Sequence, residues 1–190
     1  AVLLTSDAKT RKLLYRVLVR GDAQVVAALL REAANDADPT IRLWAVAQGG
    51  ELLAPSELAA IAAKAISDRY GAVRRQGVYL YVRHFPTQTP LILTELLMDK
   101  SSALRAVARF YLAAQAPIDF AAFYREKLNA PSPPAQTAIA IRGLGETSFA
   151  QDADRVSHYA DHVDARIQSA VIDALSRLDG ERFVAYFSQA

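Results

Sequence analysis

The chain has 190 residues, with 22 Lys and Arg against 20 Asp and Glu, a formal net charge of +2 and no cysteine. The lack of cysteine excludes disulfides, thiolate chemistry and a cysteine-ligated metal site. The near-balanced charge disfavours a dedicated nucleic-acid binder, which is usually strongly basic. No apolar run approaches the length of a membrane-spanning helix.

Six segments of the chain share one amphipathic helical pattern. Apolar residues fall three, four, seven and eight places after a reference position, which is the spacing of one face of an α-helix. In the first segment this face predicts a core of Leu13, Leu14, Val17 and Leu18. Reference positions recur every 31 or 32 residues, a period typical of a solenoid. They are Thr10, Ile41, Val73, Leu104, Gln136 and Ile167.

Helix starts are predicted just before these positions. A residue that can accept hydrogen bonds from bare backbone N–H groups stands three places earlier in four segments. Pro39 suits the first position of the second helix. Tyr70 and Pro133 replace the capping residue, so we expect altered turns in the third and fifth segments. The capping residues are Asp7, Asp38, Ser101 and Asp164.

A second helix is predicted before each later member of this series and at the chain's end. Ser148 and Gln151 have the spacing of a capping box at the start of one of them. The expected helices are Asp22–Ala34, Ser56–Ser67, Thr89–Met98, Asp119–Leu128, Ser148–Ala160 and Gly180–Ser188.

Two glycine pairs are expected to end helices of the first series. Gly49 and Gly50 predict a break and a turn after the second reference helix. Gly143 and Gly145 are expected to close the fifth. No strand precedes that second pair and no Gly-Lys-Ser/Thr follows it, so a phosphate-binding loop is excluded.

The N-terminal end of the chain suggests that residues once preceded it. Ala1-Val2-Leu3-Leu4 is too short for a signal peptide, and the chain does not start with methionine. We expect either that a leader was removed or that the chain is a fragment of a longer protein. A cytoplasmic location is favoured, although a periplasmic protein can also lack cysteine.

Four short runs resemble the HEAT-repeat family, including the HEAT-like repeats of bacterial proteins. The resemblance implies an all-α protein, a right-handed α–α superhelix of about six helix pairs, related to armadillo-like stacks and forming one domain over residues 1–190. In the fifth segment, Pro133-Pro134-Ala135-Gln136-Thr137 departs from the pattern, and the register there is either as given or shifted by one residue. The four runs are Asp38-Pro39-Thr40-Ile41-Arg42, Ala72-Val73-Arg74, Ala103-Leu104-Arg105 and Asp164-Ala165-Arg166-Ile167-Gln168.

The same resemblance implies a structural ladder of ion pairs along the stack. In HEAT repeats the position after the reference commonly pairs with a capping Asp of the same or an adjacent unit. Here that position holds Arg11, Arg42, Arg74 and Arg105, and the candidate partners are Asp7, Asp38, Asp68 and Asp99.

A further row, two and six places after each reference position, should face the concave side of the superhelix. Cations alternate there with aromatic and apolar residues, and Arg and Tyr are frequent anchors of protein interfaces. The row is either a partner-binding groove or ordinary surface. Its candidate residues are Lys12, Arg16, Arg75, Tyr79, Arg83, Phe110 and Arg142.

Two further features carry alternative interpretations. Trp44, the only tryptophan, is either a packed core residue or a stacking platform for a base or peptide. His158 and His162 are spaced to share a metal on one helix face, or form a surface pair near a helix C-terminus. No catalytic motif accompanies them, and no cofactor is expected.

The leading hypothesis is therefore a non-catalytic scaffold that binds a protein or peptide on its concave face. The partner could be another domain of the same polypeptide. The alternative is a HEAT-like alkylpurine DNA glycosylase or another DNA-binding protein. Those glycosylases resemble this chain in architecture, but they carry several tryptophans and a catalytic Asp in a strongly basic groove. Chromophore lyases with HEAT-like repeats are a third possibility.

Overall fold

The structure, a computed structural model, describes residues 7–187 and consists of helices joined by turns, with no strand in that range. The all-α prediction is therefore confirmed for this part of the chain. The expectations for Ala1-Val2-Leu3-Leu4 and for Ser188 lie outside the described residues.

The chain divides between Ile92 and Leu93 into two compact units, called here unit 1 and unit 2. Helix α7, Thr89–Leu96, contains the division. The single domain over residues 1–190 stays a prediction.

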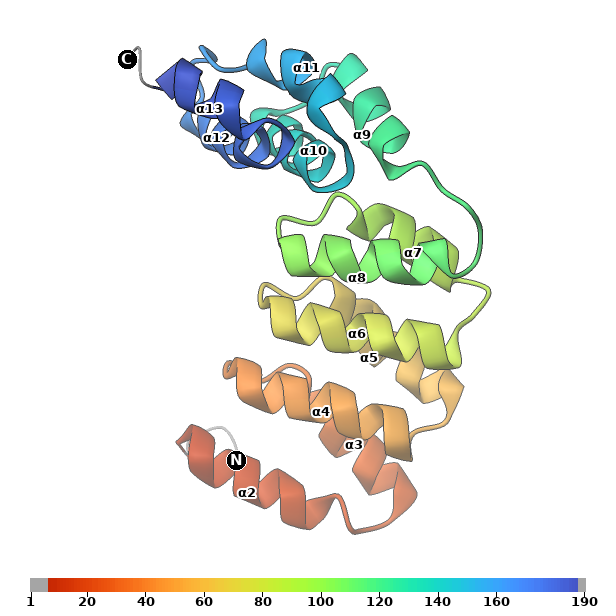
Figure 1. The fold of residues 1–190 in the computed structure, drawn as a ribbon. Helices are drawn as coiled ribbons and strands as arrows, with labels where there is room; N and C mark the ends of the chain where they lie inside the picture. Colours follow the sequence, from red (N-terminus) through yellow and green to blue (C-terminus); the bar gives the residue numbers. More distant parts are fainter. Residues whose placement is uncertain (1–6, 188–190) are drawn as a thin grey trace. The chain divides into compact units, whose positions relative to one another are not determined.

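Unit 1 is built from successive helices that pack against their neighbours. Helix α4 contacts α3, α5 and α6, and α5 contacts α6. Figure 1 shows α2, α4 and α6 side by side in one row, with α3 and α5 behind them. The bounds are α2, Ala8–Leu18; α3, Ala23–Ala33; α4, Pro39–Leu52; α5, Pro55–Ile66; and α6, Gly71–His84.

Unit 2 is arranged around α10 and α12, which pack against each other. Helix α10 also contacts α9, while α12 contacts α11 and α13. The bounds are α8, Ser102–Ala113; α9, Phe120–Asn129; α10, Pro134–Thr147; η1, Ala150–Asp152; α11, Ala153–Ser157; α12, Ala165–Leu178; and α13, Gly180–Phe187.

The helix expected over Ser148–Ala160 is replaced by the short 3-10 helix η1 and the five-residue α11. The capping-box prediction is wrong, because Ser148 is the C-terminal cap of α10. Its hydroxyl donates to the buried carboxylate of Asp152. That carboxylate also accepts from Arg125, so this turn is organised by a buried charge rather than by a helix cap.

Three of the four predicted capping residues accept backbone hydrogen bonds. Asp7 accepts from the N–H groups of Lys9 and Thr10, Asp38 from Thr40 and Asp164 from Arg166. The Ser101 side chain forms no such bond, and neither do Tyr70 and Pro133. The Arg166 guanidinium, assisted by the Arg166 N–H, lowers the pKa of Asp164 to about 2.

From α4 onward the predicted positions four and eight places after each reference position are buried, whereas those three and seven places after it are only half-buried in α4 and α8. Ile41, Val73, Leu104 and Ile167 are all buried. In α10, Gln136 is exposed, but the residues four, five, eight and nine places later are buried. The residues at those same offsets from Ile41 are also buried, which favours the given register over one shifted by a residue. In α10 they are Ala140, Ile141, Leu144 and Gly145, and in α4 they are Ala45, Val46, Gly49 and Gly50.

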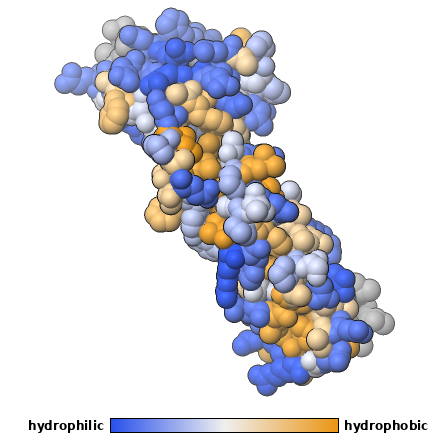
Figure 2. All heavy atoms as spheres, turned by 90° about the vertical axis from the view of Figure 1, so that its right-hand side faces the viewer, coloured by the Kyte–Doolittle hydropathy of each residue, from blue (hydrophilic) through white to orange (hydrophobic). Residues whose placement is uncertain are grey.

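The first reference helix is an exception to this pattern. Helix α2 buries Tyr15, while Leu13, Val17 and Leu18 are exposed and Leu14 is half-buried. The prediction that these leucines and Val17 pack into the core is therefore wrong for three of the four. Contacts of α2 are concentrated on α3, so only one side of α2 is covered by described residues. Figure 2 shows small groups of apolar side chains among polar ones at the surface of both units.

The glycine pairs do not end their helices. Gly49 and Gly50 lie inside α4, and Gly143 and Gly145 lie inside α10. A Cβ atom on Gly145 would lie 2.6 Å from Cα of Ala174 in α12, and one on Gly50 would lie 2.5 Å from Cδ2 of Leu80 in α6. These glycines therefore permit close approach between neighbouring helices, and the predicted breaks are wrong.

None of the described helices has both the length and the apolar character needed to cross a bilayer.

We expect Gly145→Ala to destabilise the chain by about 1–3 kcal/mol, because the added Cβ would force α10 and α12 apart. This cost should exceed the gain of about 0.5–1 kcal/mol that alanine brings inside a helix. Urea unfolding followed by circular dichroism measures the difference. Gly180→Ala is the matched control, since a Cβ at that position would meet no described residue within 4 Å apart from its chain neighbours and the backbone of its own helix. An unchanged or raised stability of Gly145→Ala would contradict close packing of α10 on α12.

Candidate functional site

The strongest candidate site is a cavity of about 410 Å³ in unit 1, called here the cation–aromatic groove. Its side chains come from α2, α4 and α6, which lie next to one another in the row of Figure 1. Lining residues are Lys12 from α2, Thr40, Leu43, Trp44 and Ala47 from α4, and Ala72, Arg75, Gln76 and Tyr79 from α6.

The groove is formed by equivalent positions of successive helices. Each lining residue of α4 has its counterpart in α6 exactly one 32-residue step later, as Leu43 has in Arg75 and Trp44 in Gln76. On each helix these residues follow the spacing i, i+3, i+4 and i+7, which makes one continuous stripe. Lys12 occupies the position of Leu43 on α2. The repeat therefore brings together residues that are far apart in the sequence.

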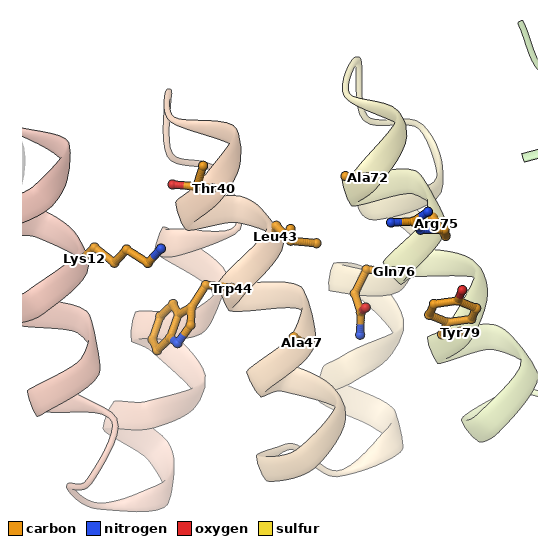
Figure 3. A pocket seen from close by; sticks show the side chains of 9 residues that line it. All are labelled: Lys12, Thr40, Leu43, Trp44, Ala47, Ala72, Arg75, Gln76 and Tyr79. Carbon is orange, nitrogen blue, oxygen red and sulfur yellow. The ribbon is translucent and has the colours of Figure 1, made fainter. Parts of the chain in front are cut away.

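Two cations of the groove have no internal partner. The side chains of Lys12 and Arg75 form no ion pair or hydrogen bond within residues 7–187, and no carboxylate is among the nine lining residues. Figure 3 shows Lys12 extending from α2 toward α4, and Arg75 extending from α6 toward α4. The two positive charges thus face the same cavity without a neutralising group.

The aromatic side chains give the groove a partly apolar wall. Trp44 is half-buried, with its ring centroid 6.1 Å from that of Tyr15. Tyr79 is 40% exposed at the other side of the cavity. The two interpretations of Trp44 are therefore not exclusive, since it packs against the core and also faces the cavity. Such a wall can bury the apolar part of a ligand and offer the indole N–H as a donor.

The predicted partner-binding row is only partly assembled at this site. Lys12, Arg75 and Tyr79 line the groove. Arg16 is exposed on α2 outside it, and Arg83 forms an exposed ion pair with Glu51 at 2.5 Å.

Two members of the row lie in unit 2. Phe110 is 70% exposed and packs edge-on against Tyr111. Arg142 donates from Nε to Asp173 Oδ2 at 2.8 Å and from Nη2 to Ser169 Oγ at 3.0 Å. Its charge is therefore engaged on the surface of α12.

Sequence reasoning missed Thr40, Ala72 and Gln76 as lining residues, and it left Trp44 open. All four stand one place before or three places after a reference position. The predicted row is defined by the residues two and six places after each reference position. The residues one place before and three places after it lie on the same helical stripe, so helical spacing could have identified them.

Three of the arginines that follow a reference position bind the turn that precedes their own helix. Arg42 Nη1 donates to the carbonyls of Asp36 and Ala37 at 2.9 and 3.0 Å. Arg74 and Arg105 donate in the same way to the carbonyls of Asp68 and Asp99, each at 2.7 Å.

The carboxylate partners differ from those expected. Arg42 forms a two-bond pair with Asp68, one of the candidate carboxylates, at 2.6 and 2.8 Å, whereas Arg11 pairs at 2.8 and 2.7 Å with Asp36, which was not among them. Arg105 pairs with Glu146 of α10. Asp7 and Asp38 instead cap their own helices. That these contacts fix the register along the whole stack stays a prediction.

The buried pairs change the acidity of their carboxyl groups. Hydrogen bonds from Arg11 and Arg42 lower the pKa values of Asp36 and Asp68, although burial alone would raise them. The same pairs raise the pKa values of the two guanidinium groups. Both ions of each pair are therefore stabilised in the folded chain.

The two histidines each bind the local backbone. His158 Nδ1 lies 2.6 Å from the Asp154 carbonyl, and His162 Nδ1 accepts from the Asp164 N–H at 3.0 Å. Within residues 7–187, no group of three His, Cys, Asp or Glu side chains is placed to hold a metal ion.

Comparison with known proteins adds no relative, since neither the protein-family models nor the curated proteins include a match to this chain.

We expect Asp68→Asn to destabilise the chain by about 3 kcal/mol near neutral pH, because Arg42 would keep a buried charge without its counter-ion. The folded-state pKa of Asp68 is below its ordinary value of 3.8. Its stabilising contribution is therefore complete above that value and is lost as the pH falls below it. Urea unfolding between pH 7 and pH 3 should show a smaller acid-induced loss for the variant than for the wild type.

The control for this measurement is Asp22→Asn, at the exposed cap of α3. Asparagine caps a helix about as well as aspartate, so its stability should change little. Equal acid-induced losses in wild type and Asp68→Asn would contradict the stabilising role of the pair.

Proposed function

We propose that the chain is a non-catalytic helical-repeat scaffold whose cation–aromatic groove binds an extended, acidic peptide segment of a protein partner. The proposal includes a right-handed α–α superhelix of HEAT-like helix pairs, with the groove on its concave face. The partner is either a separate protein or another domain of the same polypeptide.

The observation that carries the proposal is the absence of any counter-ion in a groove that holds two cations. The side chains of Lys12 and Arg75 have no partner among the described residues, and Trp44 and Tyr79 offer apolar faces beside them. Bringing an acidic side chain to this site would satisfy both charges. Arginine and aromatic residues clustered in a pocket are the usual anchors of a protein interface.

An extended peptide also fits the neutral donors of the groove. The Gln76 amide and the Trp44 indole N–H form no hydrogen bond with any described residue, and both line the cavity. Backbone carbonyls of a peptide can accept from these groups. The groove extends over equivalent positions of two helices, which suits a ligand whose contacts repeat along its length.

The nine lining residues do not form a catalytic set. They include no carboxylate and no histidine that could act as a general base beside the hydroxyls of Thr40 and Tyr79. Resemblance to the helical-repeat glycosylases implies a catalytic Asp in the groove, and this groove has none. We therefore do not extend the proposal to a DNA glycosylase.

Peptide display against the full chain tests the proposal, with enriched sequences then synthesised and their Kd values measured by fluorescence anisotropy. We expect enriched peptides to be acidic and to contain an apolar residue. Arg75→Glu should weaken their binding by about tenfold or more, because it replaces an unpaired cation with an anion. Arg16→Glu is the matched control, as it reverses an exposed arginine outside the groove. Failure to enrich any peptide, or equal Kd values for wild type and Arg75→Glu, would contradict the proposal.

Intrinsic fluorescence provides a second prediction, because Trp44 is the only tryptophan of the chain and lines the groove. A peptide that covers the indole should exclude water and shift its emission to shorter wavelength, with saturation at the Kd found by anisotropy. The Arg16→Glu variant should show the same shift. Peptide binding without any change in the emission of Trp44 would place the binding site elsewhere.

A further inference from the structure

Unit 2 contains a second cavity, of about 210 Å³, called here the arginine cavity. It is lined from the turn before α8 by Lys100, from α8 by Ser102 and Arg105, from α10 by Arg142 and Glu146, and from α12 by Asp173 and Arg177. It shares no residue with the cation–aromatic groove.

Both carboxylates of the arginine cavity already have a cationic partner. Glu146 accepts from the fully buried Arg105 and from Arg109 at 2.9 Å, and Arg177 Nη1 lies 3.8 Å from it. Asp173 is occupied by Arg142. Further positive charge at the cavity is therefore not neutralised by the carboxylates that line it.

Lys100 supplies such an excess charge. It is exposed at the cavity and forms no ion pair or hydrogen bond within the part of the chain that the structure describes. Arg177 is 55% exposed, and its Nη1 lies 3.8 Å from Glu146 Oε1, beyond hydrogen-bond distance. Both side chains retain donors that can reach a ligand.

The start of α8 lies at this cavity, which Ser102 lines. Ser102 is the first residue of this twelve-residue helix, and the Ser101 side chain does not cap it. The backbone N–H groups of Ser102 and Ala103 have no acceptor among the described residues. Unsatisfied N–H groups and the positive end of the helix dipole favour an anion beside lysine and arginine side chains.

We infer that the arginine cavity binds a phosphate group, either as free phosphate or carried by a small phosphomonoester. The four lining cations exceed the two lining carboxylates by two charges, which matches a dianion. Lys100 and Arg177 hold the oxygens by charge, and the N–H groups at the start of α8 donate to them. The buried Arg105–Glu146 pair forms a fixed, charged wall to the site.

An adjoining cavity of about 400 Å³ shares Lys100 and Arg142 with the arginine cavity. Its other lining includes Ala138, Ile139 and Ala165. A phosphomonoester can therefore place its phosphate among the cations and its apolar body against these side chains. Free phosphate has no apolar part, so it would not occupy the adjoining cavity.

Isothermal titration calorimetry of the full chain with inorganic phosphate and with phenyl phosphate, in chloride buffer, tests this inference. We expect saturable binding of both ions, and Lys100→Gln should raise each Kd by about tenfold. Arg177→Gln is a second variant with the same expected direction. Arg155→Gln, which removes an exposed arginine of unit 2 outside the cavity, should leave both Kd values unchanged. Circular dichroism verifies that each variant is folded.

The two ligands distinguish the two forms of the anion. A lower Kd for phenyl phosphate, lost in Ile139→Ala, supports a phosphomonoester, whereas equal Kd values support free phosphate. No saturable binding with a Kd below ~10 mM, or equal weakening by Arg155→Gln and Lys100→Gln, would overturn the inference. Arg75→Glu, which alters the groove of unit 1, should not affect phosphate binding, so this result is independent of the proposed peptide site.

Discussion

The arrangement of unit 1 depends on guanidinium groups that join consecutive turns. Arg42 donates to two carbonyls of the turn before its own helix and to the carboxylate of Asp68 in the turn before α6. A guanidinium has planar, fixed donor directions, so these contacts hold only if the two helices keep one relative register. Because the pair is buried, loss of either ion would leave an unpaired charge in the interior and destabilise the fold.

That register determines which side chains share a surface. Leu43 on α4 and Arg75 on α6 occupy equivalent positions, and Lys12 occupies the same position on α2. Their helices lie side by side, so residues about 32 places apart come to line one cavity. The buried arginine stands one place after the reference position, whereas the groove residues stand one place before it and two, three and six places after it. The two sets share no position, so the groove residues can change without altering the buried ion pairs.

Much of the helical arrangement could be predicted, whereas interhelical detail could not. Period and capping depend on local sequence, which is why Asp38 and Pro39 indicated the start of α4. Closeness between helices depends on residues distant in sequence. Gly145 looked like a helix end because nothing in the adjacent sequence shows that Ala174 packs against it. For the same reason the sequence did not show that Arg11 pairs with Asp36 and not with Asp7. Both carboxylates lie near a predicted helix start, and only the packing of the helices determines which one Arg11 reaches.

The pairs Arg11–Asp36 and Arg42–Asp68 of unit 1 also share a direction, with the arginine in one helix pair and its carboxylate in the turn that leads to the next. Arg11 precedes Asp36 by 25 residues and Arg42 precedes Asp68 by 26. Deleting the 32 residues from Asp36 to Ser67 would bring Asp68 to the place of Asp36, 25 residues after Arg11. Whole 32-residue repeats of this kind can therefore be lost or gained without leaving a buried arginine or aspartate unpaired.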